Sequence, residues 1–174
     1  NWGMAASSRE NDYVHQTMKL IHALRPDADF CAAQVANWER AYWRGEEELE
    51  FVRPARDWKP DIVVIRLGEN TGENLLAEHP YAPALIDMMN FFTRNGEGRL
   101  IVTDLFWPNP AKDAEIRKAA EALEAPLVHI GDLGMRDDMK AVGLFEHGGV
   151  AAHPGDLGMK TIAERLFDVI KTMI

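Results

Sequence analysis

The stretch Asp61-Ile62-Val63-Val64-Ile65-Arg66-Leu67-Gly68 decides the fold class of this chain. It is a continuous apolar run rich in β-branched residues, and a glycine closes it. Such a run is typical of a strand that is buried on both faces of a sheet. Strands of this kind belong to parallel sheets, whose connections cross over through helices. The stretch therefore predicts an α/β protein with a parallel sheet.

The sequence on both sides of this strand alternates between strand-like and helix-like patterns. Short apolar runs predict further strands, and apolar residues at helical spacing predict helices. The predicted strands cover 29–35, 99–106 and 126–130, and the predicted helices cover 7–24, 46–51, 83–93, 109–123 and 156–173. Ser7, Asn109 and Asp156 are expected to cap three of these helices. The order predicts a three-layer α/β/α sandwich with a central parallel sheet.

Length and charge narrow the class of protein. A chain of 174 residues is long enough for one domain with a substantial core, so residues 1–174 are expected to form a single domain. The net charge of -9, without a cluster of Lys and Arg, argues against a nucleic-acid partner. No apolar stretch has the roughly 20 residues of a membrane helix. The single Cys31 excludes an internal disulfide but fits either redox compartment, so the localisation stays open.

Two short motifs lie where a parallel sheet of this kind would present reactive groups. Ligands bind at the carboxyl ends of the strands, and Gly68-Glu69-Asn70 directly follows the strand quoted above. The Asn70 amide there could donate to an oxyanion, although Gly and Asn are also favoured in ordinary turns. The second motif, His153-Pro154-Gly155, precedes the last predicted helix. His153 could act as a general base, and the alternative is a loop histidine without a catalytic role.

Together these motifs resemble those of the SGNH hydrolases, also called GDSL-type esterases and lipases. Asn1-Trp2-Gly3 resembles the second sequence block of that family, Gly68-Glu69-Asn70 the third and Ala152-His153-Pro154 the last. The resemblance implies a three-layer α/β/α domain of flavodoxin-like type. It also implies an oxyanion hole made by the Gly3 N–H and the Asn70 side chain, with His153 as the base.

The chain departs from the family at the first block, which carries the nucleophilic serine. That block should precede Asn1 and is absent. In the family it ends the central strand of the sheet, between the strands predicted here at 29–35 and 61–67. We therefore expect an upstream segment to supply both the strand and the serine. Ser7 or Ser8 is the alternative nucleophile, but Ser7 is better explained as a helix cap.

A second departure concerns the acid that normally orients the catalytic histidine. The family usually has an aspartate three residues before the histidine, where this chain has Val150. Valine cannot accept a hydrogen bond from the imidazole. The open alternatives are a backbone carbonyl, one of the acids Glu69, Glu146 and Asp132, or a Ser-His dyad.

Some details point toward a carbohydrate ester as the substrate. The strings at 2–7 and 65–70 look most like those of a bacterial subgroup associated with carbohydrate deacylation. Trp2, Trp38 and Trp107 lie in or beside the loops predicted to surround the site, where their rings could stack on sugars. The alternative for each tryptophan is that it packs its loop against the core.

We therefore expect a serine esterase that removes an acyl group, acetyl in the first instance, from a carbohydrate or similar small ester. The alternatives are a non-catalytic carbohydrate-binding or scaffold domain on the same fold, and a lipase or thioesterase of the same family. No cofactor is expected. No metal is expected either, because the pairs His147/His153 and His129/Asp132 lack the ligand spacing of a zinc site. Glu69 and Glu73 could form an acid/base pair for glycoside cleavage, but their loop setting favours solvation or local hydrogen bonds.

Overall fold

The computed structural model describes residues 3–174, apart from the side chains of residues 46 and 47. It is a mixed α/β structure with 51% helix and 8% strand. The chain divides into two compact units, unit 1 (Asn1–Phe30 and Ile130–Ile174) and unit 2 (Cys31–His129). None of the described helices is long and apolar enough to cross a membrane. The single domain predicted from the length remains a prediction.

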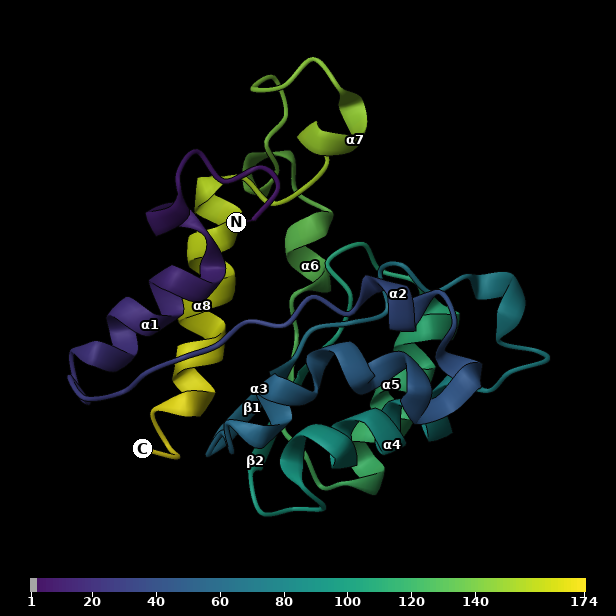
Figure 1. Ribbon diagram of the computed structural model, residues 1–174. Coiled ribbons are helices and arrows are strands. Elements are labelled where there is room, and N and C mark those ends of the chain that lie inside the picture. Colours follow the sequence, from purple (N-terminus) through teal and green to yellow (C-terminus); the bar gives the residue numbers. More distant parts are fainter. Residues whose placement is uncertain (1–2) are drawn as a thin grey trace. The chain divides into compact units, whose positions relative to one another are not determined.

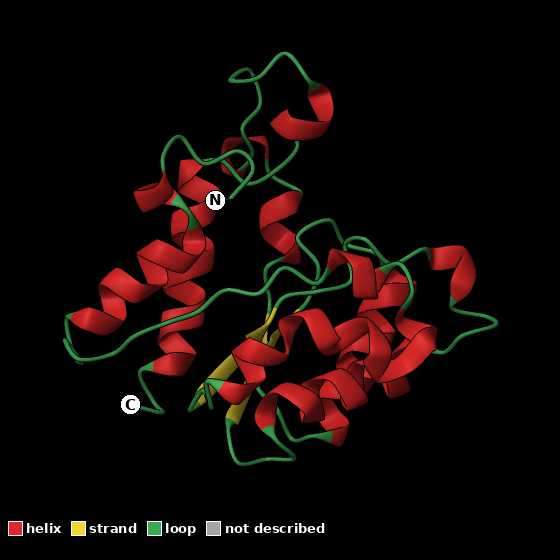
Figure 2. Ribbon diagram, viewed as in Figure 1, coloured by secondary structure: helices red, strands yellow, loops and turns green. Residues whose placement is uncertain are grey.

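The sheet lies in unit 2 and has three parallel strands in the order β1-β2-β3. The strands are β1 (Ile62–Ile65), β2 (Arg99–Thr103) and β3 (Leu127–Val128), drawn in yellow in Figure 2. Ile62 is paired with Arg99, and Val102 is paired with Leu127. Three of the four predicted strands are thus confirmed, each shorter than its apolar run, and so is the α/β class.

Helices of unit 2 build the core together with this sheet, and α4 (Tyr81–Thr93) is the helix that packs directly on the strands. The helices are α2 (Ala36–Glu39), η2 (Tyr42–Val52), α3 (Arg53–Asp57), η3 (Glu73–Leu75), α4 and α5 (Pro110–Ala122). Helix α4 packs on β1 and β2 and also against α5, with Leu85, Met89 and Ile116 fully buried between them. Helix α5 starts as predicted, because the Asn109 side chain accepts the N–H of Lys112 at 3.0 Å.

The strand predicted at 29–35 is wrong. This segment has no regular structure and runs between α1 and α2 (Figure 1). Its residues 31–34 are exposed, whereas a central strand would be buried. A run of this length forms a strand only beside a ladder partner, and no described strand pairs with it. The apolar run by itself could not reveal the missing partner.

Unit 1 is helical in its described part. Its elements are η1 (Arg9–Asn11), α1 (Tyr13–His22), α6 (Gly131–Gly134), η4 (Asp137–Met139), α7 (Gly148–Ala151) and α8 (Asp156–Ile170). Helices α1 and α8 lie side by side (Figure 1). Met18 of α1 and the stripe Met159, Ile162 and Leu166 of α8 are buried. The apolar stripe predicted for the last helix is therefore its buried face.

Two of the predicted helix caps in unit 1 are wrong. The N-cap of α1 is Asp12, whose carboxylate accepts the N–H of His15 at 2.8 Å, and the N-cap of α8 is Gly155. Ser7 instead donates its backbone N–H and its hydroxyl to the Asp156 carboxylate, at 2.9 and 2.6 Å. The two expected caps therefore bind each other, 149 residues apart in the chain.

The first turn of α8 passes very close to the backbone before it. A Cβ atom at Gly158 would lie 2.1 Å from the carbonyl oxygen of Met139, far inside van der Waals contact. We expect Gly158→Ala to lower the free energy of unfolding by about 3 kcal/mol, because backbone cannot move aside as a flexible side chain can. Gly148→Ala is the matched control, since nothing lies within 4 Å of a Cβ there. Equal urea midpoints for both variants would contradict this packing.

Candidate active site

His153 follows the short helix α7, which brings the carbonyl of Gly149 next to its ring. The ring Nδ1 lies 2.7 Å from that carbonyl oxygen, four residues back in the chain. A carbonyl oxygen can only accept, so Nδ1 carries the hydrogen of this bond. In the neutral ring, the lone pair is then on Nε2. The backbone of His153 is fixed as well, since its carbonyl accepts the N–H of Ala141 at 3.0 Å.

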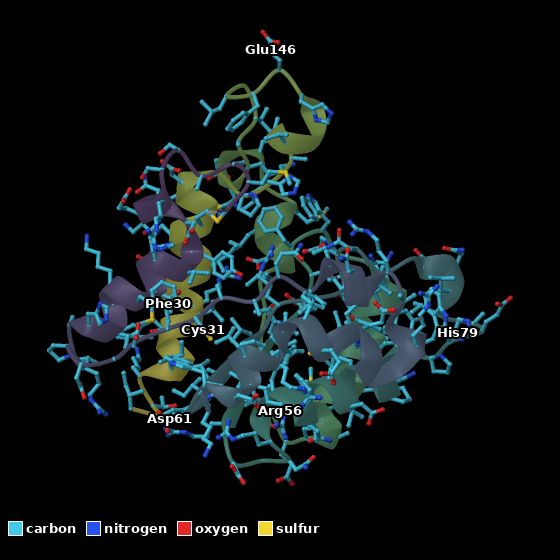
Figure 3. The ribbon with its side chains drawn as sticks, in the orientation of Figure 1. Phe30, Cys31, Arg56, Asp61, His79 and Glu146 are labelled. Carbon is cyan, nitrogen blue, oxygen red and sulfur yellow. The ribbon has the colours of Figure 1, made fainter. Side chains whose placement is uncertain are left out.

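Of the alternatives for the group that orients His153, the structure shows the backbone carbonyl. Two of the three candidate acids are committed elsewhere. Asp132 pairs with Arg165, whose Nη2 is 2.8 Å from Oδ2, and this hydrogen bonding holds the pKa of Asp132 below its usual value. Glu69 belongs to unit 2 and accepts the N–H of Phe106 at 2.9 Å. The third candidate, Glu146, lies at the tip of the loop before α7 (Figure 3).

The loop Gly68–Thr71 leaves the carboxyl end of β1. Gly68 has φ +119°, and a Cβ there would lie 2.8 Å from Cδ2 of Leu105, so glycine is required for both reasons. The N–H of Thr71 donates to the carbonyl of Gly68 at 3.2 Å. The segment is therefore a turn, as its composition predicts, and it also holds Asn70 exposed at the edge of the sheet.

Two charged residues outside the motif hold this loop. Glu39, at the end of α2, is 3% exposed and accepts the N–H of Gly68 at 2.6 Å and that of Asn70 at 3.2 Å. Its second carboxylate oxygen accepts Nδ2 of Asn70 at 2.7 Å. Lys112 of α5 donates to the carbonyls of Gly68 and Thr71, at 3.0 and 3.2 Å. Two N–H groups of the loop thus donate to a carboxylate, and two of its carbonyls accept from an ammonium.

Sequence reasoning missed both Glu39 and Lys112. Glu39 lies 29 residues before Gly68, and Lys112 lies 44 residues after it. Each is a charged residue in a short or amphipathic helix, and its residue type alone does not distinguish it from a solvated charge. The one signal for Glu39 is its neighbourhood, because Trp38 and Tyr42 beside it are large aromatics that favour burial.

Gly3, the other predicted oxyanion donor, lies in a tight place in unit 1. Its N–H donates to Oδ2 of Asp12 at 3.4 Å. A Cβ at Gly3 would lie 2.6 Å from the terminal methyl of Met159, so the backbone passes close to α8. In this structure the Gly3 N–H therefore points toward a carboxylate, through a long and weak hydrogen bond.

The three tryptophans predicted to contact substrate differ in their placement. Trp38 is 1% exposed, and its ring packs 5.9 Å from that of Tyr81 and 6.2 Å from that of Tyr42. A ring buried in the core cannot stack on a sugar, so the prediction is wrong for Trp38. Trp107 is half-buried and meets Phe106 edge-on at 5.6 Å. Trp2 lies outside the described residues.

No family model, curated protein or solved structure matches this chain. Its function is therefore argued from His153 and the Gly68–Thr71 loop. Within residues 3–174, as far as they are described, no group of three or more His, Cys, Asp or Glu side chains could hold a metal ion.

Glu69, next to Asn70 in the chain, is largely buried and titratable. Its side chain is 15% exposed and lies 3.6 Å from a guanidinium nitrogen of Arg66. Desolvation raises the pKa of Glu69 above its ordinary value, although Arg66 acts in the opposite direction. Glu73 has a different donor, since its carboxylate accepts Nδ2 of Asn109 at 2.7 Å. The two glutamates thus have separate local hydrogen bonds.

The buried Glu69 should make stability depend on pH. Because the pKa of Glu69 is raised, the folded state keeps its proton at pH values where the unfolded state has already lost it. The protonated side chain therefore contributes to stability in full below the ordinary pKa of 4.5, and this contribution disappears as the pH rises through the raised pKa. Glu69→Gln imitates the protonated form and can still accept the N–H of Phe106. We expect the variant to gain stability relative to the unmutated protein between pH 4.5 and pH 7. Urea unfolding at several pH values measures this, and a difference independent of pH would contradict it.

Proposed function

We propose that the protein is a serine ester hydrolase that removes an acyl group, acetyl in the first instance, from a carbohydrate or similar small ester. The observation that carries this proposal is the hydrogen bond from Nδ1 of His153 to the Gly149 carbonyl, at 2.7 Å. It selects the tautomer with a lone pair on Nε2, which is the form that a general base needs. The resemblance of three sequence blocks to those of the SGNH hydrolases supplies the reaction class.

The reaction would proceed in two halves. A serine hydroxyl attacks the ester carbonyl carbon while Nε2 of His153 takes the hydroxyl proton. The imidazolium then protonates the leaving alcohol, and an acyl-enzyme remains. Water attacks the acyl-enzyme with His153 again as base, which releases the carboxylic acid and the serine. The Gly149 carbonyl stabilises the imidazolium less than a carboxylate would, because it carries no full charge.

The serine itself is assigned by the resemblance to the segment before Asn1. Of the alternatives Ser7 and Ser8, Ser7 has another task in the structure, since its hydroxyl donates to Asp156 at 2.6 Å and accepts Nδ2 of Asn11 at 2.9 Å. These bonds connect the segment before α1 to the start of α8. We therefore do not assign catalysis to Ser7.

The oxyanion would be held by N–H donors. Nδ2 of Asn70 has two hydrogens, of which Glu39 accepts one. The other has no acceptor in the described part of the chain and is the donor that we assign to the oxyanion. The resemblance also assigns a donor role to the Gly3 N–H, which within unit 1 makes a long, weak 3.4 Å bond to Asp12.

We also infer that the complete sheet is the centre of a three-layer α/β/α sandwich, with a further strand beside β1. Among the described strands β1 pairs only with β2, so no described strand pairs with its other edge. Val64 in that strand is 37% exposed, although the run around it is apolar. An added strand would pair with the backbone groups of this edge and would shield side chains such as Val64 beside it. The strand that carries the serine block is the proposed occupant.

Hydrolysis of p-nitrophenyl esters by the full-length natural protein tests the proposal. We expect turnover of the acetyl ester and a fall in kcat/KM as the acyl chain lengthens from acetyl to octanoyl. A preference for octanoyl would favour a lipase or thioesterase. The absence of turnover with every ester would refute the esterase. Binding of an acetylated oligosaccharide would then favour the non-catalytic domain. The observation behind this alternative is Val150, which stands where the family usually has an aspartate.

A further inference from the structure

Glu39 is a buried carboxylate that enters the mechanism above only as the acceptor of one Asn70 hydrogen. It is 3% exposed, and its carboxylate accepts three hydrogen bonds from Gly68 and Asn70. One oxygen accepts the two backbone N–H groups, at 2.6 and 3.2 Å, and the other accepts the Asn70 side chain at 2.7 Å. Only a carboxylate offers acceptors at both ends and no competing donor, so the residue type matches the arrangement.

The next residue, Arg40, binds the other half of the same amide. Its Nη2 donates to Oδ1 of Asn70 at 3.3 Å. Glu39 thus binds the nitrogen of the Asn70 amide, and the oppositely charged Arg40 binds its oxygen. A flipped amide would place its oxygen against the Glu39 carboxylate and its nitrogen against the guanidinium, and both contacts would be repulsive. The charges therefore select one of the two amide orientations.

We infer that Glu39 is a positioning residue that fixes the Asn70 amide with one N–H available to the oxyanion; this inference rests on the proposed function. Asn70 is exposed, whereas its partner Glu39 is buried. The residue that would contact substrate is therefore held by a residue that would not. Arg40 offsets the negative charge near the oxyanion. It also polarises the amide carbonyl, which makes the remaining N–H a stronger donor.

Glu39→Gln separates positioning of the Asn70 amide from the hydrogen bonds that Glu39 makes to the loop backbone. The glutamine oxygen can still accept the N–H groups of Gly68 and Asn70, but its amide nitrogen faces Nδ2 of Asn70, donor against donor. We expect kcat of the full-length protein to fall about 10²-fold with KM changed less than about twofold, because an error of about 1 Å in a catalytic group has this effect. Glu78→Gln removes a charge from an exposed position of the same connection and is the control, with both constants unchanged.

A second measurement needs no activity. Asn70→Asp places a carboxylate against Glu39, so the urea midpoint should fall. In the Glu39→Gln background the glutamine nitrogen donates to the new carboxylate, and the midpoint of the double variant should exceed that of Asn70→Asp alone. Purely additive midpoints would overturn the inference.

The two measurements separate failure of the inference from failure of the proposed function. If the unmutated protein hydrolyses no ester, the proposed function fails, and the midpoints still decide whether the carboxylate and the amide are coupled. If Asn70→Ala loses activity but Glu39→Gln keeps it, the function stands and Glu39 is not a positioning residue. Coupled midpoints together with a selective loss of kcat support the inference.

Discussion

His153→Ala should lower kcat for ester hydrolysis by about 10⁴- to 10⁶-fold, the largest effect expected of any single substitution. The variant removes the group that takes the serine proton and later protonates the leaving alcohol. The fold should persist, because His153 is half-buried and its Nδ1 bond is made to the backbone carbonyl of the exposed Gly149. Steady-state hydrolysis of p-nitrophenyl acetate by the full-length protein measures the loss.

His22→Ala is the matched control for His153→Ala. His22 is also a histidine of unit 1 whose ring contacts a backbone carbonyl, that of Ala28 at 2.8 Å, but it is exposed at the end of α1. Its replacement should leave kcat within about twofold of the unmutated value. A His153→Ala protein that keeps a tenth or more of its activity would exclude His153 as the base.

Asn70→Ala should lower kcat by about 10²- to 10³-fold with little change in KM, which is the effect of removing one oxyanion donor. The interaction forms only when negative charge develops on the ester oxygen, so substrate binding does not depend on it. Asn74→Ala, in the exposed helix η3 of the same connection, is the control and should be silent. An increase in KM at constant kcat would mean that Asn70 binds the substrate ground state and transition state equally.

Much of the fold could be predicted because its signals are local. The apolar run around β1 and the periodic faces of α4, α5 and α8 are properties of consecutive residues, and each element formed where expected. The segment 29–35 did not form a strand, because a strand depends on a neighbour as well as on its own residues. The Ser7 cap failed for a similar reason, since a carboxylate 149 residues away binds it.

The candidate site could be predicted only in part. His153 and Asn70 carry sequence motifs, and the structure gives each a defined hydrogen-bond partner. The partner of His153 is the Gly149 carbonyl, and a backbone group has no residue type by which a sequence could reveal it. Glu39 is distant in sequence from the motif that it binds. The sequence predicts a surface position for Trp38, which is buried, because burial depends on tertiary packing that a local pattern does not reveal.

Covalent labelling with a fluorophosphonate tests the esterase most directly. The reagent loses fluoride when an activated serine oxygen attacks phosphorus, so only a serine with a working base reacts quickly. On the full-length natural protein, intact mass and peptide mapping should find one labelled serine, located before Asn1. The labelling rate should fall about 10³-fold or more in His153→Ala. No labelled serine, or the same rate in both proteins, would contradict a serine esterase with His153 as its base.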